Sequence, residues 1–146
     1  MSSRAPIAEL VRRFYNDAWD RWDDQAVDQL LAEDFVFRGS LGDEERGRDG
    51  FRAYRDKLRA AFPNFSNEIV YLVAEGERAA VRLRCSGRHE GELFAIAPTG
   101  RSVTYEATAF LRSRANQISE FRVLLDISRH KLAFGNYLKT LFTRVL

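Results

Sequence analysis

Cysteine is nearly absent from this chain, since Cys85 is the only one in 146 residues. A single thiol excludes an internal disulfide framework and fits a protein of the reducing cytosol. The sequence also has only two histidines, His89 and His130, and no cluster of cysteines, so the residue types of a typical zinc site are too few. We therefore expect no bound metal.

An excess of one charge and long apolar runs are also lacking. The net charge is +2, and arginines are interleaved with Asp and Glu along the chain, so no basic patch for nucleic acid is indicated. The apolar runs are only a few residues long, far short of the roughly 20 that cross a bilayer. Residues 1–6 lead directly into a charged amphipathic segment, so we expect no signal peptide, no membrane contact and a cytoplasmic location.

Aromatic side chains, in contrast, are plentiful: eleven Phe, five Tyr and two Trp. Such large side chains suit a core that surrounds a ligand cavity, and they suit a plain core or an interface equally well. The length fits one domain covering residues 1–146, large enough to bury a hydrophobic core. We find no repeat, linker or low-complexity segment that would divide it.

The first half of the chain has helical periodicity. Apolar residues recur every three or four positions in two long stretches, and Pro63 ends the second of them. A short apolar run and a polar, glycine-containing segment lie between the two stretches. The predicted elements are a helix over 7–22, a helix over 26–31, a strand over 35–38, a loop over 40–47 and a helix over 48–62.

The second half alternates at period two, which predicts strands. Ala115-Asn116 is a hairpin signal because Asn tolerates positive φ, although Ala115 suits such a turn poorly. The predicted strands cover 68–74, 79–89, 103–114 and 117–126, and a closing helix covers 130–146. This order predicts an α+β domain with helices on one face of an antiparallel sheet.

The predicted hairpin sets a register between its two strands. With residues 115–116 in the turn, Tyr105 lies opposite Asp126, and Arg122 lies on the same face. Small residues beside large ones on this face would leave space next to the Asp126 carboxylate, as a ligand cavity requires. The pattern also allows the alternative that the opposite face, with Phe121, points to the core and that Asp126 is solvated.

Several segments occur in an order that resembles one known family. They are AEGERAAVR at 74–82, GRHEG at 87–91, PTGR at 98–101 and ISE at 118–120, followed by Asp126. Together they resemble the SnoaL-like polyketide cyclases, also called the ester cyclase family, of the nuclear-transport-factor-2-like superfamily. The resemblance implies a cystatin-like α+β fold, in which N-terminal helices close a cone-like curved sheet around a pocket.

The resemblance also implies roles for individual residues. In the characterised cyclases, the aspartate at the Asp126 position is the acid/base of a cofactor-free intramolecular aldol closure. His89 belongs to the same cavity, where a neutral imidazole could donate to a substrate carbonyl, although a lone histidine is often a structural hydrogen-bonding residue. The family usually has Trp at the Arg122 position, and an arginine beside Asp126 would lower the pKa of the carboxylate and weaken it as a base.

The remaining candidates would contact the ligand. Arg122 and Arg38 would hold an anionic group such as a carboxylate or phenolate, unless Arg122 pairs with Asp126 and Arg38 is a surface charge. Tyr105 could orient Asp126 through a hydrogen bond or simply fill the core. The predicted pocket walls, each of which could also be plain core, are Trp19, Phe37 and Phe62.

The sequence therefore favours a cofactor-free cyclase or isomerase that acts on a small hydrophobic, polyketide-like carbonyl compound with Asp126 as acid/base. The alternative is a non-catalytic domain of the same fold that binds a ligand or another protein. A row formed by Arg82, Arg84 and Arg88 is predicted on the outer face of the sheet, through which we expect a homodimer.

Overall fold

The computed structural model describes residues 6–38, 44–92 and 97–126, without the side chains of residues 125 and 126. Within these ranges helices come first and strands later, as the periodicity predicts. The predicted closing helix over 130–146 lies outside the described residues. The elements are α1 (Ile7–Arg13), η1 (Phe14–Asp20), α2 (Asp24–Leu30), β1 (Leu31–Arg38), β2 (Glu44–Arg46), α3 (Gly47–Ala61), β3 (Ser66–Glu75), β4 (Arg78–Arg88), β5 (Ser102–Arg114) and β6 (Gln117–Asp126).

The predicted first helix changes its hydrogen-bonding pattern half-way along. α1 is a regular α-helix, whereas η1 is a π-helix, in which a backbone N–H bonds the carbonyl five residues earlier, as Arg21 does to Asn16 at 3.1 Å. Trp22, the last apolar residue of the predicted helix, lies beyond it with φ of 56°. The Asp23 carboxylate then caps α2 by accepting from the backbone N–H of Gln25 at 2.9 Å.

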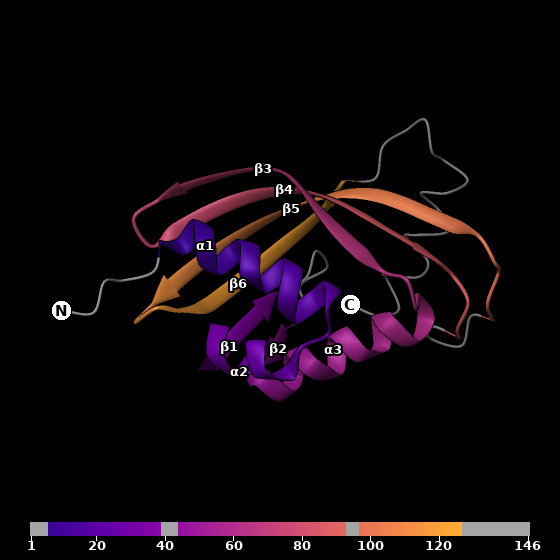
Figure 1. Cartoon of the computed structure of the whole chain (residues 1–146), viewed down its shortest axis with the longest axis horizontal. Helices are drawn as coiled ribbons and strands as arrows, with labels where there is room; N and C mark the ends of the chain where they lie inside the picture. The colour runs from indigo at the N-terminus through magenta and orange to yellow at the C-terminus, as the bar shows by residue number, and fades with distance from the viewer. Residues whose placement is uncertain (1–5, 39–43, 93–96, 127–146) are drawn as a thin grey trace.

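The strands of the described ranges form one six-stranded sheet in the order β2-β1-β6-β5-β4-β3. The four long strands β3 to β6 make the expected antiparallel meander, and Figure 1 shows them curving over α1. The sheet is mixed, however, because β1 runs parallel to β6, and β2 adds an edge strand where a loop was predicted. The parallel pair is possible because α3 and the meander supply the long crossover that it needs. The α+β class and the curved sheet are confirmed.

The β5–β6 hairpin contains the predicted two-residue turn. Ala115 and Asn116 both have positive φ, at 51° and 64°, which is what a turn of this length requires. The left-handed conformation costs an alanine roughly 1–2 kcal/mol, so the turn is formed in spite of the residue at its first position. The strand pairing on either side therefore holds this turn in place.

The predicted register of this hairpin is wrong beyond its first pairs. Ser113 lies opposite Ile118, but the pairing then shifts by one residue, as a β-bulge does. Asp126 consequently lies opposite Glu106, not opposite Tyr105. A shift of one residue moves every side chain of a strand to the other face of the sheet. Beyond the shift, the described β6 side chains predicted to point inward therefore point outward.

The described side chains of β6 show this exchange. Phe121 and Val123 are buried against the helices, whereas Arg122 and Leu124 are exposed on the outer face. The prediction for β4 holds, because its apolar residues are buried and the row of Arg82, Arg84 and Arg88 lies on the other face. The sheet thus has an apolar inner face and an outer face that carries both charged and exposed apolar side chains.

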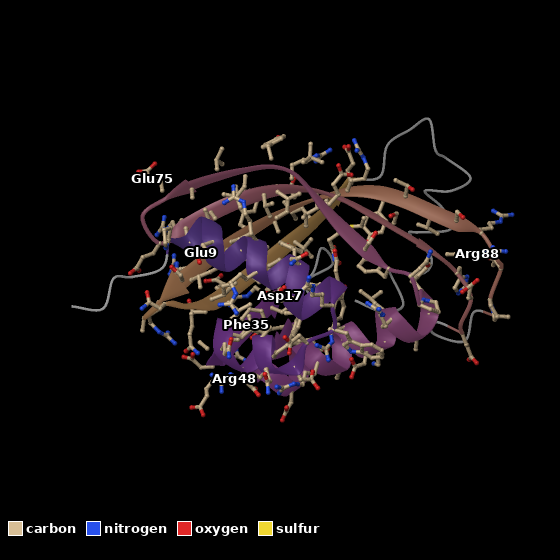
Figure 2. The ribbon with its side chains drawn as sticks, in the orientation of Figure 1. Glu9, Asp17, Phe35, Arg48, Glu75 and Arg88 are labelled. Carbon is tan, nitrogen blue, oxygen red and sulfur yellow. The ribbon has the colours of Figure 1, made fainter. Side chains whose placement is uncertain are left out.

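The core lies between the inner face of the sheet and the helices. The Phe14 ring packs against those of Phe51 and Phe121, with centroid distances of 5.2 and 5.4 Å. In Figure 2 the fully buried Phe35 lies within this layer, while Glu75 and Arg88 lie at opposite ends of the long strands. None of the helices in the described ranges is long and apolar enough to cross a membrane.

Candidate functional site

A cavity of about 40 Å³ lies between the inner face of the sheet and the helices η1 and α3. Aromatic and aliphatic side chains form most of its walls. One water needs roughly 10–15 Å³ by the same measure, so the cavity has room for a few waters or for one small polar group of a ligand. The wall residues with polar side-chain atoms are Tyr15, Trp19, Tyr54, Asn67, Cys85 and Tyr105.

Two of these polar residues, Tyr15 and Trp19, come from η1. Their exposed fractions are only 2% and 6%. Neither the Tyr15 hydroxyl nor the Trp19 Nε1 has a hydrogen-bond partner among the residues that the structure describes. An unsatisfied buried polar group costs about 1–3 kcal/mol, so two of them on one cavity wall indicate a site that holds an acceptor.

Two arginines of α3 hold the end of η1 that carries Trp19. The Arg55 guanidinium donates to the Ala18 carbonyl at 3.2 Å, and Arg59 donates to the Asp20 carbonyl at 3.1 Å. The last carbonyls of a helix lack partners within the helix, and positive charge is favourable there. The two carbonyls flank Trp19, so these contacts fix the backbone from which the indole reaches the cavity.

A chain of hydrogen bonds forms another part of the wall. The Tyr105 hydroxyl donates to the Cys85 thiol, and the thiol donates to Asn67 Oδ1 with an Sγ–Oδ1 distance of 3.4 Å. Asn67 Nδ2 donates in turn to Asp20 Oδ1 at 3.0 Å. Burial raises the pKa of Asp20, while the Asn67 hydrogen bonds and the Arg59 charge act in the opposite direction. The chain thus connects the cavity to a half-buried carboxylate.

Three titrating groups on the described walls, Tyr15, Cys85 and Tyr105, are neutral at physiological pH. Burial raises the pKa values of Tyr15 and Tyr105 well above the usual tyrosine value, and it raises that of Cys85 to about 12. No residue described on the walls carries a formal charge. The described ranges also contain no group of three or more His, Cys, Asp or Glu residues that could hold a metal ion. The cavity therefore suits an uncharged ligand, bound through hydrogen bonds.

Of the predicted pocket residues, Trp19, Phe37 and Tyr105 line this cavity. The Phe37 ring stacks on that of Phe121 with a centroid distance of 5.0 Å, so the parallel β1–β6 pair supplies one aromatic wall. Phe62 is buried but is not among the described lining residues, and its ring packs against His89 at 5.4 Å.

His89 is fully buried and holds a turn next to the end of α3. Its Nδ1 accepts from the backbone N–H of Thr99 at 3.3 Å, and its ring is also hydrogen-bonded to the backbone of Gly91. The backbone N–H groups of Glu90 and Gly91 donate to the Ala61 carbonyl at 2.9 and 3.0 Å. His89 is not among the described residues that line the cavity, so its placement favours the structural role.

The His89 imidazole makes stability depend on pH. Burial lowers the pKa of His89 below its usual value, so the unfolded state binds this proton first as the pH falls. We expect the free energy of unfolding to decrease below about pH 6.5, by at most about 1.4 kcal/mol per pH unit from this one group. In urea titrations the difference between wild type and His89→Gln should shrink over this range, and a constant difference would contradict the account.

The two arginines predicted in the pocket lie elsewhere. Arg38 pairs with Glu120 at 2.7 Å and with Glu44 at 3.7 Å. Arg122 is exposed on the outer face of β6, while its neighbour Phe121 lines the cavity. The register shift explains this placement, because it turns Phe121 inward and Arg122 outward. Neither arginine supplies an anion site on the described walls.

Asp126 is the last residue of β6, and its side chain lies outside the described residues. Its backbone lies opposite Glu106, so the hairpin register does not place it across from Tyr105 as predicted. The acid/base role of Asp126 therefore stays a prediction that rests on the family resemblance.

Four polar residues of the cavity were not predicted from the sequence as site residues: Tyr15, Tyr54, Asn67 and Cys85. A signal for Tyr15 is present, because it lies four residues before Trp19 in the same apolar stripe. Asn67 also has a sequence signal. It lies two residues before Ile69, so both side chains point to the inner face of the strand, where a polar residue is unusual.

The comparisons with known proteins agree with this geometry. The chain matches the family model of the SnoaL-like polyketide cyclases over residues 9–130. No curated protein sequence matches it. A candidate SnoaL-like polyketide cyclase from Jannaschia sp. CCS1 is 20% identical, with a TM-score of 0.78 over 97% of both chains.

Two further solved structures have the same fold. IdmH, a candidate polyketide cyclase from Streptomyces antibioticus, is 22% identical with a TM-score of 0.73, over 94% of this chain and 96% of that one. A Catenulispora acidiphila protein with a ketosteroid isomerase-like fold is 18% identical with a TM-score of 0.70, over 87% of this chain and 92% of its own. The structural likeness shows the fold, and the family match covers most of the chain: this protein belongs to the SnoaL-like polyketide cyclase family.

Proposed function

We propose that the cavity binds the carbonyl group of a small hydrophobic compound and that the protein rearranges this compound by cofactor-free acid/base chemistry, as a cyclase or an isomerase. The observation that carries the proposal is the pair of buried donors, the Tyr15 hydroxyl and the Trp19 Nε1. A carbonyl oxygen has two lone pairs and can accept from both. The apolar remainder of the wall would hold the hydrocarbon part.

These donors favour one kind of chemistry. Removal of a proton next to a carbonyl moves negative charge onto the oxygen, and donors in a water-poor cavity stabilise that charge more than they stabilise the ketone. Because burial raises the pKa of Tyr15, its hydroxyl keeps its proton and donates throughout the reaction. Cyclisation by aldol closure and isomerisation of a double bond both pass through such an enolate.

In this proposal Asp126 is the base that removes the proton. This role is supported by the family resemblance, which implies an acid/base aspartate at this position, the last residue of β6. This role requires the Asp126 carboxylate to reach the cavity from the end of β6, where a water-poor surrounding would raise its pKa toward the range in which it can take a proton from carbon. The same residue would return the proton in the last step.

The exchange of α-protons of 2-tetralone in D2O, followed by NMR, tests this proposal without knowledge of the substrate. Wild type should accelerate exchange over buffer, and Asp126→Asn should abolish the acceleration. Tyr15→Phe should lower it by about 100-fold, as loss of one oxyanion donor does. Tyr71→Phe is the matched control, because Tyr71 is 60% exposed on β3 and should leave exchange unchanged.

The same experiment addresses the non-catalytic alternative. A binding domain would retain 2-tetralone, detected by saturation-transfer NMR, and would not accelerate its exchange. Binding that Tyr15→Phe weakens, without exchange above buffer in wild type, would therefore favour the alternative.

We also propose that a second copy of the chain covers the outer face of the sheet. Several large apolar side chains are exposed there, and such patches are typical of interfaces. Light scattering at micromolar concentration should give the mass of a dimer, and Phe110→Glu should give a monomer. A monomeric wild type would contradict the dimer. The exposed apolar residues are Tyr71, Val73, Phe110 and Leu124.

A further inference from the structure

The Asp20 carboxylate holds the Asn67 amide in one orientation. Asp20 Oδ1 accepts from the backbone N of Asn67 at 3.1 Å and from its Nδ2 at 3.0 Å. An ionised carboxylate can only accept hydrogen bonds, so the NH2 half of the amide must face Asp20. The carbonyl half faces the other way, toward the Cys85 thiol that donates to it at 3.4 Å. The direction of this amide is thus set by its partners.

This orientation presents an acceptor to the cavity. Asn67 lines the wall, and its Oδ1 has a second lone pair beyond the one that the weak thiol donor of Cys85 uses. Tyr15 and Trp19 contribute donors to the same cavity. The described polar groups are therefore of both kinds, donors on η1 and an acceptor on β3.

We propose that Asp20 is a positioning residue that fixes Asn67 as an acceptor, so that the cavity selects compounds with a hydroxyl or enol donor beside the carbonyl. Hydroxyketones and enolised diketones are the ligand classes that fit. The inference deepens the proposed function and rests on it, because Tyr15 and Trp19 must bind the carbonyl before Asn67 can accept a hydrogen bond from the hydroxyl of the same ligand.

The selection depends on the charge of Asp20. The groups that face this carboxylate are the Arg59 guanidinium from α3, Asn67 from β3 and the Cys85 thiol from β4. When Asp20 takes up a proton it becomes a donor, and the Asn67 amide can turn its oxygen toward it. Because burial raises the pKa of Asp20, this change comes at a higher pH than it would for an exposed aspartate, and the acceptor leaves the cavity as the pH falls.

Calorimetric titrations with matched ligands test the inference. The probes are acetophenone, its 3- and 4-hydroxy derivatives, and the 3- and 4-methyl derivatives, in which a methyl group replaces the hydroxyl at nearly the same volume. One of the two positions, 3 or 4, should show the larger preference for hydroxyl over methyl in wild type. At that position Asn67→Leu should lower the preference by about ten-fold, because the ligand hydroxyl loses its buried partner. Glu68→Gln, at the next and exposed position of β3, should leave the preference unchanged.

The pH profile separates positioning from a structural role. In wild type the preference for hydroxyl should fall as the pH is lowered through the range in which Asp20 takes up its proton. In Asp20→Asn it should be low at every pH, since the new amide can donate to Asn67 Oδ1. Equal losses of affinity for hydroxyl and methyl probes in Asp20→Asn, or a pH-independent preference in wild type, would overturn the inference.

Acetophenone distinguishes this failure from failure of the proposed function. Its binding needs only the carbonyl site and should weaken in Tyr15→Phe but hardly in Asp20→Asn. If acetophenone binds and no preference for hydroxyl exists, only the role of Asp20 and Asn67 is overturned. If none of the probes binds, the carbonyl site and the inference are both contradicted.

Discussion

Replacement of Arg55 by alanine is expected to lower the free energy of unfolding by about 3 kcal/mol, from an unsatisfied carbonyl, lost packing and lost ion pairs. Arg55 is 2% exposed, and its guanidinium donates to the Ala18 carbonyl. It also pairs with Asp24 and lies 6.0 Å from the centroid of the Phe51 ring. Its loss would release the end of η1, so the cavity should lose ligand affinity along with stability.

Arg52→Ala is the matched control, one turn earlier on α3. Arg52 makes more ion pairs than Arg55, with Asp24, Asp28 and Asp49, but all three carboxylates are exposed. Exposed pairs contribute little, so we expect a loss of no more than about 1 kcal/mol. Urea unfolding measures both variants. Equal losses would mean that charge pairing, and not the buried contact with η1, explains the role of Arg55.

The second large effect is expected at Gly91. A Cβ atom at this position would lie 2.0 Å from the Ala60 carbonyl oxygen and 2.9 Å from its carbon, which are backbone atoms that cannot turn aside. Gly91→Ala must therefore push the 89–91 segment off the end of α3 and break the hydrogen bond to Ala61. We expect a loss of about 3 kcal/mol, at the upper end of the cost of overpacking.

Gly50→Ala is the control for this substitution and should have the opposite sign. Gly50 lies within α3, where a Cβ would be 3.6 Å from the nearest atoms, those of the Glu45 side chain. Alanine in a helix is better than glycine by roughly 0.5–1 kcal/mol, so a small gain is expected. If Gly91→Ala melts at the wild-type temperature, the close approach to Ala60 does not exist in solution.

Most of the fold could be predicted because its periodicities are strong and local. The helices, the four long strands and the turn at 115–116 all follow from such patterns. The parallel β1–β6 pair could not be predicted, because two strands far apart in the chain meet only through the tertiary fold. The short β2 has three exposed residues and no apolar pattern, so nothing in its sequence separates it from a loop.

The candidate site was predictable in its aromatic walls and not in its polar groups. The register shift in β6 turns Phe121 to the inner face and Arg122 to the outer face, so the expected charged pocket is not formed by Arg122. The sequence does contain a sign of this bulge, because the large apolar residues Ile118 and Phe121 are three positions apart. Both are buried, and a regular strand does not bury two residues at that spacing on one face. The π-helix that carries Tyr15 and Trp19 leaves the apolar stripe unchanged, so the pattern reads as an ordinary α-helix.

The carbonyl 13C resonance of labelled acetophenone bound to the protein tests the central claim most directly. A carbonyl that accepts hydrogen bonds from Tyr15 and Trp19 should resonate downfield of its position in an apolar solvent. Tyr15→Phe, which keeps the ring and removes the hydroxyl, should move the resonance part of the way back. A bound resonance at the apolar-solvent position, unchanged by Tyr15→Phe, would contradict the account.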